Sequence, residues 1–182
     1  DISSLALRIV CERIGLGSGI APQLFAPDGR FLSTLILSPP GGGKTTLLRD
    51  LIRVLSLGDS EHRALRAAVI DERCEIAVCC KGRPQMELGN HTDVLSLCPK
   101  AVGMEMVLRG MNPQLIAVDE ITASEDIRAM CLAANCGVGL LASIHASNAE
   151  ELAQKPLFEE LLHARVFRRC VTIGFDSGER TY

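Results

Sequence analysis

The chain has 182 residues, of which 47% are hydrophobic and 23% charged, and its formal net charge is −3. This length suits one domain with a sizeable core. With five Phe, one Tyr, no Trp and a negative net charge, it lacks the stacking platforms and basic stripe typical of nucleic-acid-binding proteins, so we expect no nucleic-acid partner. No apolar run approaches the ~20 residues of a membrane-spanning helix and no signal sequence opens the chain, which favours a soluble cytoplasmic protein without a transmembrane segment.

The first 30 residues differ in pattern from the rest. The chain does not begin with Met, and apolar residues at helical spacing from Ile2 to Val10 predict a helix over residues 2–14. Residues 15–30 are rich in Gly and Pro and predict a linker with a turn at Pro27-Asp28-Gly29. We therefore interpret residues 1–30 as the remnant of a truncated N-terminal region and residues 31–182 as the main domain.

Beyond residue 30, short apolar runs alternate with helical patterns. Five strands are predicted over residues 31–37, 67–70, 115–118, 138–144 and 170–173, and helices near residues 46–57, 101–111, 124–136 and 148–165. This alternation predicts an α/β fold with a mostly parallel sheet flanked by helices. Ligands of such folds bind at the carboxyl ends of the strands.

The first strand leads into the glycine-rich turn of a phosphate-binding loop. Its backbone amides can surround an anion, Lys44 can reach the β- and γ-phosphates, and the Thr45 hydroxyl can bind Mg²⁺. Ser38 replaces the usual first glycine, and a plain flexible turn is the alternative interpretation. ATP is favoured over GTP because the chain has no N-K-x-D sequence. The predicted nucleotide-binding residues are Pro40, Gly41, Gly42, Gly43, Lys44, Thr45 and Thr46.

The third predicted strand, Leu115–Val118, ends in two acidic residues. Asp119 is predicted to bind Mg²⁺ opposite Thr45. Glu120 is placed to orient and deprotonate the attacking water. The alternative is that both acids are solvated loop residues.

The fourth predicted strand, residues 138–144, is followed by His145. In phosphate-loop proteins with a Glu after the acidic Asp, this strand commonly lies beside the phosphate-loop strand. His145 would then lie near the γ-phosphate, where its imidazole could report the phosphate or stabilise transition-state charge. The alternative is a structural histidine at a strand end.

Eight cysteines lie on or near apolar segments, without a C-x-x-C pair. We expect reduced and mostly buried thiols. A zinc site formed by Cys74, Cys79 or Cys80, Cys98 and His91 is a weaker alternative.

Several motifs taken together resemble the type II/IV secretion ATPases. Leu108–Ile116, Asp119-Glu120-Ile121, Ala133-Ala134 and Ser143–Ala146 are similar to their Walker B and His-box regions. Asp71–Glu75 is similar to their Asp box, and the resemblance covers about residues 1–175. Two positions depart from the family: Asp119 stands where Gly is usual, and Thr122 replaces an Arg.

The resemblance implies a RecA-like P-loop NTPase core that hydrolyses Mg-ATP and assembles into a hexameric ring. Glu120, Lys44 and His145 are the implied catalytic residues, with Glu72 and Glu75 of the Asp box positioning water or metal. Arg73, Arg83 and Arg109 are candidates for reaching a phosphate in the same or a neighbouring subunit.

The phosphate loop and Asp box are most similar to those of the sporulation members of this family. This similarity implies partners in a membrane channel between mother cell and forespore, and a peripheral location at the mother-cell side of the forespore membrane. Two alternatives remain, a nucleotide-gated binding module with negligible turnover and a RecA-like nucleic-acid motor.

Overall fold

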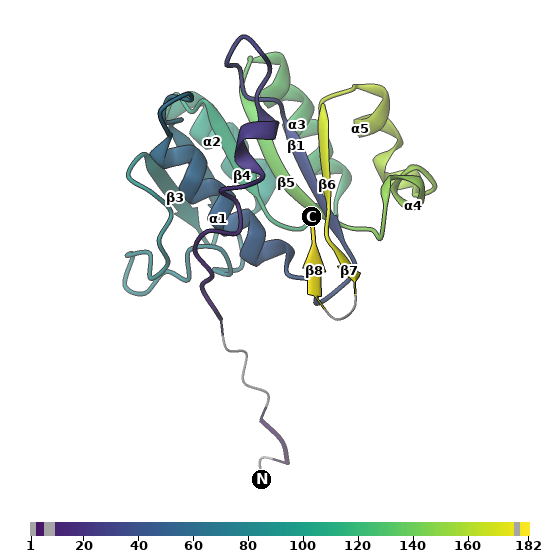
Figure 1. The fold of residues 1–182 in the computed structure, drawn as a ribbon, viewed down its shortest axis with the longest axis horizontal. Coiled ribbons are helices and arrows are strands. Elements are labelled where there is room, and N and C mark those ends of the chain that lie inside the picture. Colours follow the sequence, from purple (N-terminus) through teal and green to yellow (C-terminus); the bar gives the residue numbers. More distant parts are fainter. Residues whose placement is uncertain (1–2, 6–9, 177–178) are drawn as a thin grey trace.

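A six-stranded sheet forms the centre of the computed structural model, which describes residues 3–5, 10–176 and 179–182. Its strand order is β3-β2-β4-β5-β1-β6, and all neighbouring strands are parallel (Figure 1). This confirms the predicted α/β class. The strands are β1 (Thr34–Ser38), β2 (Ala67–Asp71), β3 (Thr92–Ser96), β4 (Leu115–Val118), β5 (Gly139–His145) and β6 (Arg169–Thr172).

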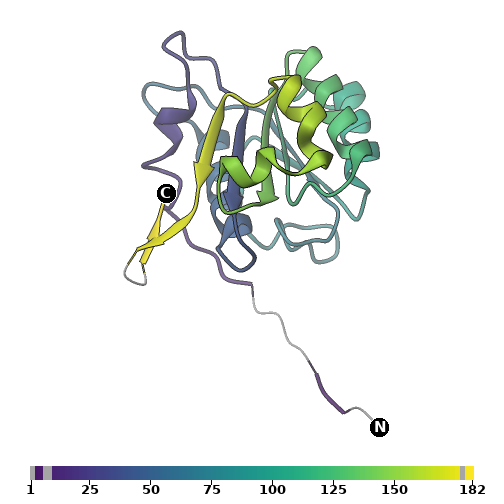
Figure 2. The same cartoon turned by 90° about the vertical axis from the view of Figure 1, so that its right-hand side faces the viewer.

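Helices cover both faces of this sheet. α1 lies on one face with the N-terminal segment, and the later helices lie on the other (Figure 2). The helical segments are η1 (Ala21–Leu24), α1 (Lys44–Leu57), α2 (Lys100–Gly110), α3 (Ser124–Asn135), α4 (Ala149–Ala153), η2 (Pro156–Phe158) and α5 (Glu159–His163).

Strand β1 shows how the sequence supplies both layers. Ile36 packs with the α1 side of the core, while Leu35 and Leu37 pack with the α2 and α3 side. Side chains alternate between the faces of a strand, so a strand buried on both faces is apolar throughout. Complete burial of one such side chain contributes about 1.5–3 kcal/mol, which fixes β1 and the loop that follows it in the centre of the sheet.

The predicted helix over residues 2–14 is wrong where the structure describes it. Residues 3–5 and 10–13 have no regular secondary structure; residues 2 and 6–9 lie outside the described residues. Tertiary hydrogen bonds replace the helical ones, because the Cys11 carbonyl accepts from Arg49 and the Glu12 carboxylate accepts from the Glu87 amide. A single short helix is only marginally stable in water without a surface to pack on.

The predicted linker packs against α1. Asp50 accepts hydrogen bonds from the Gly15 and Gly17 amides, and Ala21 and Leu24 are buried. The expected turn at residues 27–29 is present, closed by a bond from the Gly29 amide to the Ala26 carbonyl. A functional boundary at residue 30 remains a prediction.

Other predicted elements are present with shifted ends. Pro156 interrupts the helix expected over residues 148–165, because proline cannot donate a helical hydrogen bond and clashes with the preceding turn. The sequence pattern missed β3, an edge strand containing Asp93. It also missed the antiparallel hairpin of β7 (Gly174–Asp176) and β8 (Glu179–Thr181).

The cysteines differ from expectation in their burial. All eight thiols are free, four are exposed and four are partly exposed, so the prediction of mostly buried thiols is wrong. No group of metal-binding side chains occurs among the described residues, which argues against the zinc alternative. In the described part of the chain, no helix is long and apolar enough to cross a membrane.

Candidate nucleotide-binding site

The phosphate-binding loop joins the carboxyl end of β1 to the first turn of α1. Gly41 and Gly43 adopt positive φ angles of 76° and 100°, which glycine tolerates at little cost. A Cβ atom on Gly42 would lie 1.6 Å from the Ser38 Oγ. Ser38 therefore fits in place of the usual glycine because Gly42 has no side chain.

This close approach predicts the effect of exchanging Gly42. Gly42→Ala is expected to distort the loop and weaken nucleotide binding about tenfold or more, because overpacking typically costs 1–3 kcal/mol. Ser38→Gly/Gly42→Ala removes the Oγ that meets the new methyl group and is expected to recover much of the loss. Calorimetric titration with ADP measures both effects. Equal affinities of the single and double variants would contradict this account of Ser38.

Lys44 is buried at the base of the loop, with 6% of its surface exposed. Its Nζ donates to the Ser38 and Pro39 carbonyls at 3.0 and 3.2 Å and lies 2.7 Å from the His145 Nδ1. Burial lowers the pKa of Lys44, although the charges of Asp119 and Glu120 act in the opposite direction. The ammonium group is thus held at the loop by neutral acceptors that a phosphate can replace.

Asp119 and Thr45 meet across the site, as the sequence predicts. The Thr45 hydroxyl donates to the Asp119 Oδ2 at 2.6 Å, and the buried Ser143 hydroxyl donates to the Oδ1. A carboxylate and a hydroxyl are the hard oxygen ligands that Mg²⁺ prefers, so this pair fits the predicted metal. The sequence pattern missed Ser143, whose hydroxyl on β5 reaches Asp119 and Glu120 only because β4 and β5 pair.

Glu120 adopts a left-handed backbone conformation, with φ of 51°. Such conformations are costly for residues other than glycine and persist where surrounding contacts impose them. Here the Ser143 hydroxyl accepts a 3.0 Å hydrogen bond from the Glu120 amide, and the Ile121 amide donates to the Ser143 carbonyl. The strained turn aims the Glu120 carboxylate at the same cavity as Lys44 and His145.

The Glu120 carboxylate contacts two bases. Its Oε1 lies 2.7 Å from the His145 Nε2, and its Oε2 accepts from the Arg73 guanidinium. Burial acts to raise the pKa of Glu120, but the hydrogen bonds and charges of Arg73 and His145 outweigh it and lower the pKa below its usual value. The carboxylate is therefore ionised, as a proton acceptor requires.

His145 lies where the sequence places it. β5 is inserted between β4 and β1, and His145 pairs in register with Ser38 at the start of the phosphate loop. Its two ring nitrogens contact Lys44 and Glu120. The imidazole therefore links Lys44 to the acidic end of β4.

The Asp-box segment separates its two glutamates. Glu75 lines the cavity with Arg73, whereas Glu72 faces Lys100 at the start of α2, with an O–N distance of 2.5 Å, and does not line the cavity. The turn between them is held by the buried Asp71, which accepts hydrogen bonds from the backbone amides of residues 75–77. A catalytic role of either glutamate remains a prediction.

One arginine that sequence reasoning missed also reaches the loop. Arg180 on β8 donates from Nε to the Gly42 carbonyl at 3.1 Å, and a Cβ atom on Gly43 would lie 3.2 Å from the same Nε. Phe175, paired with Arg180 across the hairpin, lies under the guanidinium at 5.8 Å. Of the three arginines named from sequence, only Arg73 lines the cavity; Arg83 and Arg109 are exposed elsewhere.

These residues surround one cavity of about 420 Å³ at the carboxyl edge of the sheet. Thr46 and Gly43 also line it, while Pro40 is exposed at the outer side of the loop. The volume falls within the range of small-molecule sites. A cavity that combines loop amides, a lysine, threonine hydroxyls and three carboxylates can bind a phosphate chain with its metal ion.

Comparison of the sequence with protein families identifies the group. Residues 1–181 match the family described as sporulation stage III, protein AA. The chain belongs to this family. It is 38% identical over 181 residues to the stage III sporulation protein AA of Bacillus subtilis (strain 168), covering all of this chain and 58% of that protein. It is also 28% identical over 166 residues to the uncharacterized protein ycf45 of Cyanidium caldarium, covering 89% of this chain and 46% of the relative.

Solved structures share the fold of this member of the stage III AA family. The pilus retraction motor PilT with bound ADP superposes with a TM-score of 0.63 at 17% identity, covering 96% of this chain and 53% of PilT. The VirB11 ATPase of Brucella suis, in complex with sulphate, superposes with a TM-score of 0.59 at 19% identity, covering 90% of this chain and 49% of VirB11. The Legionella pneumophila ATPase DotB superposes with a TM-score of 0.58 at 23% identity, covering 82% of this chain and 40% of DotB. The predicted secretion-ATPase fold is confirmed, and the chain spans about half the length of the proteins it matches.

Proposed function

We propose that this chain is the catalytic domain of a Mg-dependent ATPase of the secretion type. The observation that carries the proposal is the meeting of Lys44, Thr45, Asp119, Glu120 and His145 around one cavity at the carboxyl edge of the sheet. These side chains come from two strand ends and one helix start, far apart in sequence. The proteins that share its fold are named as ATPases and as a motor with bound ADP, which supports ATP hydrolysis as the activity.

Each residue has a distinct role in the proposed reaction. Lys44 exchanges its carbonyl partners for β- and γ-phosphate oxygens, and Thr45 with Asp119 holds Mg²⁺, which neutralises phosphate charge when bound. Glu120 orients the attacking water and accepts its proton. His145, between Lys44 and Glu120, hydrogen-bonds the γ-phosphate. Arg73 leaves Glu120 and pairs with phosphate charge.

Steady-state phosphate release tests this proposal against a binding module without turnover. We expect ATP hydrolysis that requires Mg²⁺ and stops when the metal is chelated. Tight nucleotide binding without any phosphate release, at every protein concentration, would favour the binding module instead.

Arg180 supplies a further test of the site. Arg180→Ala is expected to weaken ATP and ADP binding about tenfold, because a charge-assisted hydrogen bond is worth roughly 1.5–3 kcal/mol. Arg109→Ala removes the same charge from an exposed helix end, where Arg109 pairs only with Glu105 at 3.6 Å among the described residues. In fluorescent-nucleotide titrations, Arg109→Ala should bind nucleotide with the affinity of the wild type. Equal losses in both variants would mean that Arg180 acts only through net charge.

The implied ring makes activity depend on protein concentration. If a neighbouring subunit supplies an arginine, phosphate release per subunit should rise over a roughly hundredfold concentration range, because such a group in trans is worth ~10³ or more in rate. Analytical ultracentrifugation in parallel reports assembly. A flat and high rate in a monomer would show that one subunit is sufficient.

We further propose that the assembled protein is a hexamer peripheral to the mother-cell side of the forespore membrane, where it energises or assembles a channel complex. Membership of the sporulation stage III, protein AA family supports this place of action. Localisation of a fluorescent fusion during sporulation, with and without the channel proteins, tests it.

A further inference from the structure

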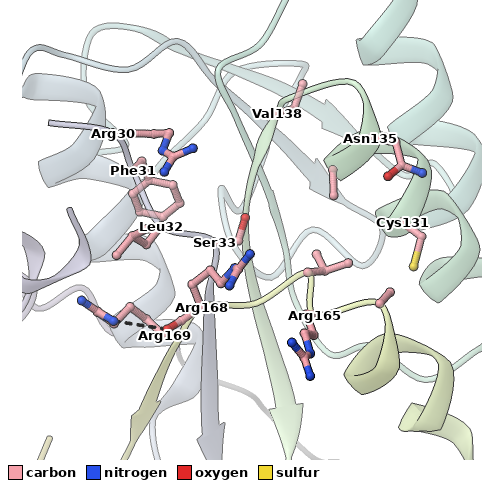
Figure 3. A pocket seen from close by; sticks show the side chains of 13 residues that line it. Arg30, Phe31, Leu32, Ser33, Cys131, Asn135, Val138, Arg165, Arg168 and Arg169 are labelled. Carbon is pink, nitrogen blue, oxygen red and sulfur yellow. Dashed lines mark hydrogen bonds between the residues drawn. The ribbon is translucent and has the colours of Figure 1, made fainter. Parts of the chain in front are cut away.

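A second and larger cavity lies at the opposite edge of the sheet from the nucleotide site. It has a volume of about 710 Å³ and is bounded by residues 30–33, the end of α3 and the loop between α5 and β6 (Figure 3). These segments surround the amino ends of β1, β5 and β6. The proposed ATPase reaction uses none of its residues.

Positive charge is concentrated in this cavity. Arg30, Arg165, Arg168 and Arg169 line it, and its described lining contains no Asp or Glu, although the whole chain has a net charge of −3. Figure 3 shows Arg30, Arg168 and Arg165 distributed across the opening, while Arg169 turns aside to the Arg168 carbonyl. Four like charges in one cavity repel one another unless an anion compensates them.

Three of the four arginines are weakly engaged within the chain, whereas Arg169 donates to the Gln23 and Arg168 carbonyls. Arg165 and Arg168 make no side-chain hydrogen bond or ion pair with any residue that the structure describes. Arg30 pairs with Asp28 at 3.9 Å, where both side chains are largely exposed; such pairs contribute little. Their guanidinium groups are therefore available to carboxylates, which they bind in a two-pronged geometry.

The backbone beneath these arginines is fixed. The Ser33 carbonyl accepts from the Arg168 amide at 2.8 Å and from the Arg169 amide at 3.2 Å, and the Ser33 hydroxyl accepts from the Leu140 amide. Arg165 is held at φ of 49° by a bond from its amide to the Leu162 carbonyl. This left-handed residue follows the C-cap of α5, a common way for a helix to end, and it fixes where the loop leaves the helix.

The floor of the cavity distinguishes between classes of anionic partner. Phe31, Val138 and Val166 supply partly buried apolar surface. Phe31 packs edge-on against Phe25 and lies against Gly139, so only part of its ring is exposed to the cavity. An apolar floor with an arginine rim is typical of protein interfaces, whereas single-stranded nucleic acid requires exposed stacking surfaces.

We propose that this arginine groove, formed by Arg30, Arg165, Arg168 and Arg169 around the floor of Phe31, Val138 and Val166, docks an acidic peptide segment of a partner protein. Carboxylates of the segment pair with Arg165 and Arg168, and an apolar side chain between them contacts the floor. The partner would thereby be attached at the edge of the sheet away from the nucleotide.

Fluorescence anisotropy with a labelled peptide of Glu, Asp and Leu tests this inference at low ionic strength. We expect saturable binding that weakens with added salt. The same peptide with Gln and Asn in place of the acids should bind at least about tenfold more weakly, because each charge-assisted pair is worth roughly that factor. Absence of binding, or equal binding of the neutral peptide, would overturn the proposal.

Matched variants locate the binding. Arg165→Ala/Arg168→Ala should weaken the acidic peptide about tenfold or more, whereas Lys81→Ala/Arg109→Ala, which removes the same charge from exposed sites outside the groove, should not. ADP titration of both variants verifies that the nucleotide site is intact. Equal effects of the two double variants on peptide binding would contradict the proposed site. The proposal would also be contradicted if an oligonucleotide or phosphatidylglycerol vesicles bound more tightly than the acidic peptide, and if only Arg165→Ala/Arg168→Ala abolished that binding.

Discussion

Glu120→Gln is expected to lower the rate of ATP hydrolysis by ~10² to 10⁴, the usual contribution of a general base, while ATP remains bound. The amide retains the size of the side chain and its contact with His145, but it cannot accept the proton of water. The backbone of residue 120, held by Ser143 in a left-handed turn, does not depend on the carboxylate. Single-turnover phosphate release and nucleotide titration measure the two effects separately.

Two comparisons sharpen this expectation. Glu105→Gln alters an exposed acid on α2 that does not line the cavity, so it serves as a control for loss of one negative charge. Because the pKa of Glu120 lies below its usual value, wild-type turnover should persist on acidification until the pH falls through that lowered pKa. If Glu120→Gln retains wild-type turnover, Glu120 is not the base.

Lys44→Ala is expected to weaken ATP binding by about 10² or more, because charge-assisted hydrogen bonds to two phosphates are each worth roughly 1.5–3 kcal/mol. The variant also removes the buried hydrogen bond from Nζ to the Ser38 carbonyl, whereas the Pro39 carbonyl still accepts from the Gly42 amide. Lys44→Met, which retains most of the side-chain volume, is therefore measured beside Lys44→Ala. Thermal melts verify that both variants fold.

Lys81→Ala, an exposed lysine beyond the site, is the charge-matched control. Fluorescent-nucleotide affinity equal to wild type in both folded Lys44 variants would contradict the assignment of the phosphate-binding loop.

The core of the site could be predicted because its residues follow strand ends. A strand buried on both faces can be recognised in the sequence as a short hydrophobic run, and parallel strands bring their carboxyl ends to one edge of the sheet. Asp119 and Glu120 follow β4, His145 ends β5, and the phosphate loop follows β1. Local pattern and strand direction were therefore sufficient to gather these residues at one edge.

Residues positioned by contacts across the sheet could not be predicted in this way. Ser143 fixes Asp119 and Glu120 from the neighbouring strand, and Arg180 reaches Gly42 through a hairpin with no hydrophobic signature. The helix expected over residues 2–14 failed for the same reason, because the carbonyl of Cys11 bonds to Arg49 instead of to its own segment. Such contacts depend on distant residues whose proximity no local spacing records.

The α/β class, the glycine-rich turn after β1, and the acidic and histidine ends of two strands could be predicted from the chain alone, because hydrophobic periodicity and turn chemistry are local properties. The fold was needed to show that Glu72 faces Lys100 while Glu75 faces the cavity, and that Arg73 and Arg180 reach the cavity. It also brought together the arginine groove from the residues before β1, the end of α3 and the loop before β6. Neighbouring side chains of a strand point to opposite faces of the sheet, and distant segments meet only when the sheet is assembled. Side-chain direction and long-range proximity therefore depend on tertiary packing.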